Sequence, residues 1–301
     1  MNEFYLVLIK KGGEIVHNTF ATTHRDLIDK YIVPKNIAHA DYFKATFRPK
    51  EGFSLVDVDE YELYVNEAFV PEWFTELNKN ECIVKLKKLI KSMFVSTHKT
   101  LLLNEGVILR NGAKVDEVKN SIVFGMYDTS SIRHLDSNSE VRVMTDDAVI
   151  EEMMDNTKVL DMWGFSKILE MHDYAKVIKM YGQAKVIKMF DNSHIATLKG
   201  DSTINEMRDA AEAERLRHMS KVEEMHNHSV IEEMWDWTIV GRMFDQAQIN
   251  YMDDDAKVLE MHDDSIIMDM YGNSIVEELF ENSLVRKLND AAVILRKQLG
   301  E

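Results

Sequence analysis

The 301-residue sequence contains a single cysteine, Cys82. A lone thiol cannot form an intramolecular disulfide, and such scarcity is typical of proteins from reducing compartments. No apolar run reaches the length that a membrane-spanning helix needs. The first residues also lack the basic start and the small-residue cleavage site of a signal peptide. We therefore expect a cytoplasmic protein that does not enter a membrane, with a virion protein or a protein secreted without a signal peptide as the alternatives.

Motifs of catalysis and nucleotide binding are missing as well. The sequence has no phosphate-binding loop and no dinucleotide-binding fingerprint. Cys82 has no identifiable base near it in the sequence. The histidines of the N-terminal part show neither metal-ligand nor triad spacing; they are His17, His24, His39 and His98. These absences predict a protein that is not an enzyme, with no catalytic residues and no metal ligands.

A nine-residue repeat, by contrast, fills more than half of the chain. From residue 121 to residue 288, the unit small-x-(Val/Ile)-x-x-(Met/Leu)-x-x-x occurs 19 times without an insertion. The Met/Leu slot begins at Met126, and the Val/Ile slot has one exception, Ala213. In an α-helix, nine residues would turn successive units to opposite sides, whereas small-x-(Val/Ile) has the period of a β-strand. Turn residues are frequent after the Met/Leu slot. The repeat therefore predicts a β-solenoid.

Two kinds of repeat alternate along this solenoid. Gly164, Gly182, Gly200 and Gly272 occupy the same slot, at spacings of 18, 18 and 72 residues. Tyr or Trp is frequent just before this slot in the same set of repeats, and Phe or His in the other set. We therefore predict a mainly-β parallel β-helix in which each 18-residue coil carries two nine-residue repeats.

The predicted organisation has four parts. Residues 1–100 form a small α/β or α+β N-terminal domain, residues 101–120 a linker and an atypical capping coil, residues 121–290 the β-solenoid, and residues 291–301 a C-terminal cap. Caps are expected because a terminal coil exposes an unpaired strand edge. We expect the C-terminal cap to be a short helix or a frayed coil.

Local patterns predict several elements more closely. In the N-terminal domain they are a hairpin of strands 4–9 and 14–20, a helix capped by Thr22 or Thr23, strands 42–47 and 61–65, a helix starting at Pro71, and an amphipathic helix 81–94. The apolar stripe of the last helix contains Ile83, Leu86, Ile90 and Met93. Within the repeats, residues 207–225 are rich in helix formers, but their preserved register favours a continued β-coil.

The negative charge is confined to the repeats. Residues 1–120 contain 17 acidic and 17 basic side chains, whereas residues 121–301 contain 35 and 19, which accounts for the net charge of −16. Nucleic-acid binders usually present a basic face, so direct binding of nucleic acid is disfavoured. A basic protein is the expected partner.

An acidic column is expected on one face of the solenoid. In alternate repeats the slot before Met/Leu is mostly Glu, interrupted by His134, Lys188 and Arg242. The structural explanation is a solvated face whose bases reduce repulsion between coils. The functional explanation is a ladder that imitates a phosphate backbone for a basic partner. The candidate partner-binding residues, called the Glu ladder, are Glu152, Glu170, Glu206, Glu224, Glu260 and Glu278.

A second column of acids is expected at a corner of the coil. Calcium-binding β-rolls also stack Asp at turns, but they need a Gly-rich loop that this sequence lacks. Side-chain capping of the turn explains Asp and Asn equally well. We therefore expect no cofactor, with Ca²⁺ as the less favoured alternative. The members of this Asp column are Asp155, Asp173, Asp191, Asp209, Asp245 and Asp263.

Aromatic and Met columns complete the pattern. The aromatic column comprises Trp163, Tyr181, Trp235 and Tyr271. Exposed aromatic rings stack on sugars or anchor a protein partner; alternatively, these rings fold back on the turns. The Met column could bind soft metal ions through its thioethers. Because Leu replaces Met freely in this slot, we expect these residues to form the core instead.

With these repeats, the chain resembles short-repeat β-solenoids of bacteria and phages. It is similar in architecture to pentapeptide-repeat proteins, some of which are acidic rods that imitate DNA. The period differs, nine residues against five, so the resemblance implies architecture only. By analogy we expect an acidic rod that occupies a basic surface of a nucleic-acid-handling or defence protein. The alternatives are a scaffold or spacer whose N-terminal domain binds the partner, a glycan-binding adhesive rod, and a homodimer through a terminal coil.

Overall fold

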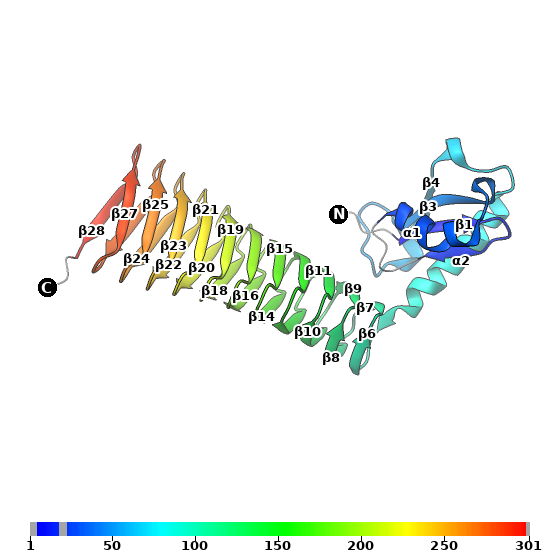
Figure 1. Ribbon diagram of the computed structural model, residues 1–301, viewed down its shortest axis with the longest axis horizontal. Coiled ribbons are helices and arrows are strands. Elements are labelled where there is room, and N and C mark those ends of the chain that lie inside the picture. The colour runs from blue at the N-terminus through cyan, green and yellow to red at the C-terminus, as the bar shows by residue number, and fades with distance from the viewer. Residues whose placement is uncertain (1–4, 18–22, 299–301) are drawn as a thin grey trace. The chain divides into compact units, whose positions relative to one another are not determined.

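The computed structural model describes residues 5–17 and 23–298 of the chain (Figure 1). These residues form two compact units, called here the N-terminal unit and the solenoid, which divide near residue 95 except that Gly106–Ile108 group with the first unit. The predicted fold class is confirmed, since a small α/β region is followed by a parallel β-solenoid of about 18 residues per turn. No helix in the described part of the chain combines the length and the apolar character of a membrane span.

The N-terminal unit contains one antiparallel sheet and two helices. The sheet has the order β2-β1-β3-β4. Its strands are β1 Tyr5–Lys10, β2 Ile15–His17, β3 Tyr42–Pro49 and β4 Tyr61–Val65, and the helices are α1 His24–Tyr31 and α2 Glu76–Ser92. Four short 3₁₀ helices connect them, at Val33–Lys35, His39–Asp41, Val58–Glu60 and Glu67–Phe69. The predicted hairpin and both predicted single strands are confirmed, although residues 4, 18–20 and 22 lie outside the described part.

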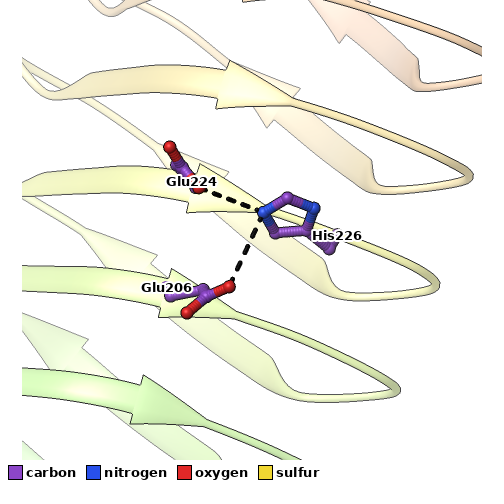
Figure 2. A group of neighbouring side chains, drawn as sticks. All are labelled: Glu206, Glu224 and His226. Atoms are coloured by element: carbon purple, nitrogen blue, oxygen red, sulfur yellow. Dashed lines mark hydrogen bonds and ion pairs between the residues drawn. The ribbon is translucent and has the colours of Figure 1, made fainter.

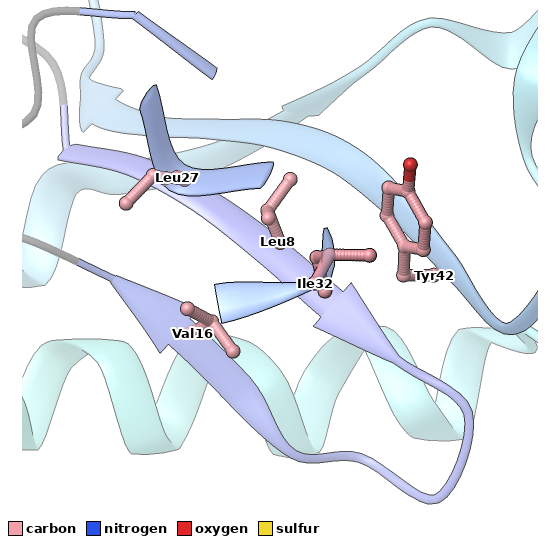
Figure 3. Packing of buried hydrophobic residues seen from close by; sticks show 5 residues of the cluster. All are labelled: Leu8, Val16, Leu27, Ile32 and Tyr42. Atoms are coloured by element: carbon pink, nitrogen blue, oxygen red, sulfur yellow. The ribbon is translucent and has the colours of Figure 1, made fainter. Parts of the chain in front are cut away.

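Buried side chains from sheet and helix form the core of this unit. Leu8, Val16, Leu27, Ile32 and Tyr42 pack together as one cluster (Figure 3). Thr23 positions α1, because its hydroxyl accepts the amide hydrogen of Asp26 while the Asp26 carboxylate accepts that of Thr23. This reciprocal capping satisfies two amides that a helix start otherwise leaves without partners.

The helix predicted from Pro71 is wrong. Residues 71–75 form a turn, and α2 begins only at Glu76, with Thr75 as its N-cap. Tertiary contacts explain the difference, because the Trp73 indole donates a hydrogen bond to the Ala40 carbonyl at 2.9 Å. Trp73 also packs edge to face on Phe43, with ring centres 5.8 Å apart. These contacts with the sheet hold residues 71–75 in a turn. Local helix propensity does not include such contacts.

Helix α2 is amphipathic, as predicted; Leu86, Ile90 and the C-cap residue Met93 of the predicted apolar stripe are buried, and Cys82 takes the place of Ile83. The fully buried residues are Cys82, Leu86 and Ile90, whereas Ile83 is half-buried. Burial also raises the pKa of the Cys82 thiol. The thiolate is the reactive form of cysteine, so burial makes Cys82 a packing residue rather than a nucleophile.

The solenoid consists of two parallel sheets of 12 strands that wind through about 11 turns. The even-numbered sheet contains β6 Lys99–Leu103, β8 Lys114–Lys119, β10 Ser131–Asp136, β12 Val149–Met153, β14 Lys167–Met171, β16 Lys185–Met189, β18 Thr203–Met207, β20 Lys221–Met225, β22 Ile239–Met243, β24 Lys257–Met261, β26 Ile275–Leu279 and β28 Val293–Lys297. The odd-numbered sheet contains β5 Phe94–Val95, β7 Gly106–Leu109, β9 Ile122–Met126, β11 Glu140–Met144, β13 Lys158–Met162, β15 Lys176–Met180, β17 His194–Leu198, β19 Glu212–Leu216, β21 Val230–Met234, β23 Gln248–Met252, β25 Ile266–Met270 and β27 Leu284–Leu288. Successive strands of the chain therefore alternate between the two sheets.

The small, Val/Ile and Met/Leu slots of the repeat form the solenoid core. Met153 lies beside Met171, and Ile150 beside Ile168, so residues 18 apart stack in register. From Met126 to Met270 the residues of the Met/Leu slot are completely buried. The Met column is therefore core packing. Residues 207–225 contain β19 and β20, which confirms the continued β-coil; Ala213 takes the Val/Ile slot between Ile195 and Ile231.

The coils at both ends differ from the others. Leu102 pairs with Val118, and Val118 with Leu135, so the first two coils have 16 and 17 residues instead of 18. At the other end, residues 293–297 form strand β28, and the predicted short helix is wrong. Parallel pairing with β26 provides the physical reason, because the amide of Val293 donates to the Ser274 carbonyl at 3.1 Å.

The small slot provides a stability prediction. The buried hydroxyls of Ser202, Ser229 and Ser265 have no hydrogen-bond partner among the described residues. Ala occupies the same slot at Ala211 and Ala247, where it is equally buried. We expect Ser202→Ala to raise the free energy of unfolding by roughly 1 kcal/mol, because an unpaired buried hydroxyl is costly. Urea denaturation followed by circular dichroism measures this change.

Ser139→Ala is the matched control. The Ser139 hydroxyl donates to the Val118 carbonyl at 3.1 Å and accepts the amide hydrogen of Ser121. Its removal should lower the free energy of unfolding by about 1–2 kcal/mol, because it leaves buried groups unpaired. Equal effects of the two substitutions would contradict the account.

Candidate interaction surfaces of the solenoid

The Glu ladder lies on the outer face of the even-numbered sheet. Its members come directly before the Met/Leu slot of their strands, and residues 18 apart are neighbours in the sheet, as Glu152 is to Glu170 and Glu206 to Glu224. Lys188 and Arg242 lie in the same column. The structure thus places all six predicted Glu residues in one line across adjacent strands.

Cationic or imidazole partners accompany every member of the ladder. Arg208 contacts Glu206, Arg242 contacts Glu224, and Arg296 lies 2.7 Å from Glu278. Imidazole nitrogens of His134, His172 and His262 lie 2.9, 3.4 and 3.3 Å from Glu152, Glu170 and Glu260. The ladder is consequently a network of local pairs, and not a row of unpaired carboxylates.

The excess negative charge lies in the turns. Between residues 121 and 297, the strands contain 17 acidic and 16 basic side chains, whereas the turns that join them contain 17 acidic and 3 basic. The strand faces are therefore almost neutral, and the two edges of the solenoid are strongly acidic. A sequence count by domain could not separate these surfaces, since strand and turn residues alternate every few positions.

The Asp column forms one of these edges, which we call the aspartate edge. It consists of the turns that follow the even-numbered strands, such as turn 172–175, closed by a hydrogen bond from the Ala175 amide to the His172 carbonyl at 3.0 Å. Its first central residue is left-handed, with φ of +54° at both Asp155 and Asp173. Asp and Asn tolerate this conformation better than other non-glycine residues.

Each carboxylate of the column also joins two coils. The amide of Asp155 donates to Asp173 Oδ2 at 3.0 Å, and the amide of Asp173 donates to Asp191 Oδ2 at 3.1 Å. Asn227 continues the chain of hydrogen bonds, since its Oδ1 accepts the amide hydrogen of Asp209. The predicted side-chain capping is therefore present, but the amide that is capped belongs to the preceding coil. This arrangement accounts for Asp and Asn in the column without a metal ion.

The opposite edge, called the glycine edge, uses the same backbone device. It consists of the turns that follow the odd-numbered strands. The left-handed slot is filled by glycine, as at Gly164 and Gly182 with φ of +65° and +63°, by Asp, as at Asp236 and Asp254 with φ of +60° and +55°, or by His218 with φ of +61°. Glycine adopts this conformation without strain. Glycine on this edge and Asp on the aspartate edge thus occupy the same position of the nine-residue repeat and adopt the same left-handed conformation.

Substitutions at Asp191 test the cross-coil hydrogen bond. Asp191→Asn keeps both the acceptor and the tolerance for positive φ, and we expect it to change the free energy of unfolding by less than about 0.5 kcal/mol. Asp191→Ala should lower it by about 1–2 kcal/mol, because it loses the acceptor and places Ala in a left-handed conformation. Asn192→Ala is the control, since Ala210 occupies that slot one coil later. If thermal denaturation gave Asp191→Ala and Asp191→Asn the same melting temperature, the cross-coil hydrogen bond would contribute nothing to stability.

The predicted aromatic column is divided into two groups on the glycine edge. Trp163 stacks on Tyr181, with ring centres 4.0 Å apart. Trp235 and Tyr271 lie further along and are bridged by Tyr251, 5.1 Å from each. Tyr251 belongs to β23 and was not predicted, because its slot is a strand slot. Its hydroxyl donates to Asp253 at 2.6 Å, and this hydrogen bond raises the pKa of Tyr251 to about 12.

Rings also stack on the aspartate edge, where the sequence shows His and Phe at the same slot. His226, Phe244, His262 and Phe280 form a continuous stack, with ring centres 4.9, 5.0 and 4.4 Å apart. Such regular stacking follows from strands in register about 4.8 Å apart. Both edges therefore contain rings that pack on rings of adjacent coils.

One cluster has the composition of a metal site. Among the described residues, Glu206, Glu224 and His226 bring three ligand atoms within 4.8 Å of one another (Figure 2). His226 Nε2 lies 3.2 Å from Glu224 and 3.8 Å from Glu206. The hydrogen bond with His226, together with the Arg242 charge, holds the pKa of Glu224 below its ordinary value. Because guanidinium groups already contact both carboxylates, the cluster is an ion-pair network that links three coils.

Comparisons with known proteins found no matching family model, no curated protein of significant sequence similarity and no solved structure of significantly similar fold. The function proposed below therefore rests on the geometry and the charge of this chain.

Proposed function

We propose that the chain is a non-enzymatic binding protein whose acidic solenoid occupies a basic surface of another protein. The observation that carries this proposal is the charge of the turns, with 17 acidic against 3 basic side chains between residues 121 and 297. Carboxylates in regular rows attract cationic surfaces, and the range of this attraction shortens as the salt concentration rises. A nucleic-acid-handling or defence protein presents such a surface, and the acidic rod would compete there with nucleic acid, as a phage-type inhibitor does. We place this activity in the cytoplasm, where a free buried Cys82 stays reduced.

Binding measurements at two salt concentrations test the proposal. The purified full chain is immobilised and exposed to a panel of basic nucleic-acid-binding proteins and, separately, to double-stranded DNA. We expect at least one basic protein to bind at low salt and to dissociate at high salt, because exposed charges are then screened. We expect no DNA binding. Absence of protein binding at low salt, or binding of DNA, would overturn the proposal.

The N-terminal unit supports a second candidate function, in which the solenoid is a scaffold or spacer and this unit binds the partner. It is a separate compact unit with its own sheet and core. A variant that lacks residues 1–94 discriminates between the two functions. Retained binding of basic proteins assigns the activity to the solenoid, whereas its complete loss assigns it to the N-terminal unit.

Two further activities are tested with the same protein. Trp163 remains 37% exposed beside Tyr181, and a glycan array would detect a role of this pair in sugar stacking. At the last coil, Leu288 in the Met/Leu slot is 45% exposed, although the residues of this slot from Met126 to Met270 are completely buried. Light scattering during gel filtration would detect a homodimer formed through this coil.

A further inference from the structure

Two large apolar side chains are exposed side by side on the glycine edge. Met219 is 60% exposed and Trp237 is 63% exposed. They occupy the same turn slot, 18 residues apart, and the Trp237 amide donates to the carbonyl of His218 in the preceding coil at 3.0 Å. Met and Trp are enriched in the centres of protein interfaces, and Trp is the most frequent energetic anchor there. Exposed neighbours of these types therefore indicate a contact surface.

Acidic side chains lie on the Trp237 side of this pair, whereas the turn of Met219 contains Arg217 and His218. Asp236 precedes Trp237 in its turn, and the next turn of the same edge contains three consecutive acids, residues 253–255. Neither turn, 235–238 or 253–256, contains Lys or Arg. Asp236 and Asp254 each use one carboxylate oxygen to accept an amide hydrogen from the preceding coil, at 2.8 and 3.2 Å. These hydrogen bonds fix the position of the carboxylates and leave their charge in place.

The nearest base on this edge is already engaged. Arg217 lies over the Trp235 ring, with its guanidinium carbon 4.6 Å from the ring centre, and pairs with Glu233 at 3.8 Å. The same combination, a guanidinium over an indole beside a carboxylate, is thus present within the chain at Trp235, two residues before Trp237. Trp237, whose ring is exposed, offers an equivalent face to a group from outside.

We propose that Met219, Asp236, Trp237, Asp254 and Asp255, called here the Trp237 surface, anchor the basic partner by binding one of its arginine side chains. The guanidinium would lie over the Trp237 ring, where cation–π attraction and the nearby carboxylates act together. Arginine is favoured over lysine, because its planar group stacks on aromatic rings and is less strongly hydrated. Met219 supplies apolar contact beside it. This inference rests on the proposed function and locates its binding site on the glycine edge rather than on the Glu ladder.

Short basic peptides serve as the probes. Octa-arginine and octa-lysine are titrated against the full chain at low salt by fluorescence anisotropy of a labelled peptide. We expect tighter binding of octa-arginine. Trp237→Ala should weaken octa-arginine binding about tenfold and octa-lysine binding much less. Trp163→Ala, which removes an indole elsewhere on the same edge, is the matched control and should leave both affinities unchanged.

Charge is tested with two triple variants that change the net charge equally. Asp236→Asn, Asp254→Asn and Asp255→Asn together should weaken octa-arginine binding about tenfold, because the variant keeps the amide acceptors but loses three charges. Glu152→Gln, Glu170→Gln and Glu260→Gln together remove three charges from the Glu ladder and should change affinity less than threefold, roughly, since paired surface charges contribute little. Circular dichroism and melting temperatures of all variants establish that the solenoid is retained.

The outcomes separate this inference from the proposed function. If the unaltered chain binds neither peptide nor any basic protein at low salt, the proposed function fails and the inference fails with it. If the unaltered chain binds octa-arginine in a salt-dependent manner, but Trp237→Ala and the Asp triple variant bind as tightly as it does, only the Trp237 surface is overturned. A larger loss in the Glu ladder variant would return the site to the even-numbered sheet.

Discussion

Replacing Met234 by aspartate is expected to unfold the solenoid around strand β21. Met234 is completely buried, between Leu216 and Met252 of the neighbouring coils. An aspartate there would bring a carboxylate into an interior built from Met, Val and Ile, where no cation can reach it. Burial of an unpaired charge places this substitution among the most destabilising kinds, with an expected loss above about 4 kcal/mol in the free energy of unfolding. Urea denaturation followed by circular dichroism would show the loss.

Met234→Leu is the matched control for this prediction. Leu already fills the same slot at Leu198 and Leu216, both completely buried. A volume-conserving change of this kind should cost less than about 1.5 kcal/mol. If Met234→Asp were as stable as Met234→Leu, the Met column would not be the core of the molecule, and a role in binding would have to be considered again.

The second prediction with a large expected effect compares the removal of a complete coil with the removal of one residue. Deletion of residues 193–210 joins Asn192 to Ala211, keeps the small slot filled, and places β19 where β17 lies, in the same sheet. We expect this variant to fold, with a circular dichroism spectrum like that of the full chain and a length shorter by about 4.8 Å. The reason is that each coil contacts only its neighbours, so stability is approximately a sum over coils and their interfaces.

Deletion of Asn192 alone should be far more damaging, although it removes one residue instead of 18. It would shorten the turn between β16 and β17, in which Asp191 and Asn192 bond to neighbouring coils, so either these cross-coil hydrogen bonds are lost or the later strands shift by one position, which turns core side chains to the outer face. We expect its unfolding to divide into two transitions, one for the coils on each side of the defect. A single transition at the original urea concentration would contradict the nearest-neighbour description. Residues 193–210 lie outside the Trp237 surface, so the full-coil deletion should also retain binding of octa-arginine.

The repeat determined the solenoid because its pattern is local. A small residue, Val or Ile, and Met or Leu at fixed positions in nine residues specify one short strand and one turn, and 18-residue stacking follows from the two alternating kinds of repeat. For the same reason the columns of Glu and Asp were located correctly, and so was the β-coil at residues 207–225. Each of these features needs only the register, which the chain keeps without an insertion from residue 121 to residue 288.

Other features depend on contacts that no local pattern contains. Trp73 and Phe43 are 30 residues apart, and their packing replaced the expected helix at Pro71 with a turn. Strand β28 lacks Met or Leu in its core slot, where Lys297 stands, and forms because the open edge of β26 offers amide partners. Cys82, not Ile83, is buried on α2, since the position of the helix on its neighbours selects the face.

The surface charge shows most clearly which features follow from the local repeat and which depend on tertiary contacts. From the sequence alone, the net charge of −16 belongs to the repeats, and the Glu ladder and the Asp column are both candidate locations for it. The tertiary structure places cationic or imidazole partners beside those Glu residues and leaves the excess on the turns, where Asp fills left-handed positions and caps amides of the adjacent coil. Register alone decides which residues share a column. The partners of the Glu ladder come from two sources, residues two positions away in the chain, such as His172 beside Glu170, and residues of the adjacent coil, such as Arg242 beside Glu224, which become neighbours only because the strands pair in register.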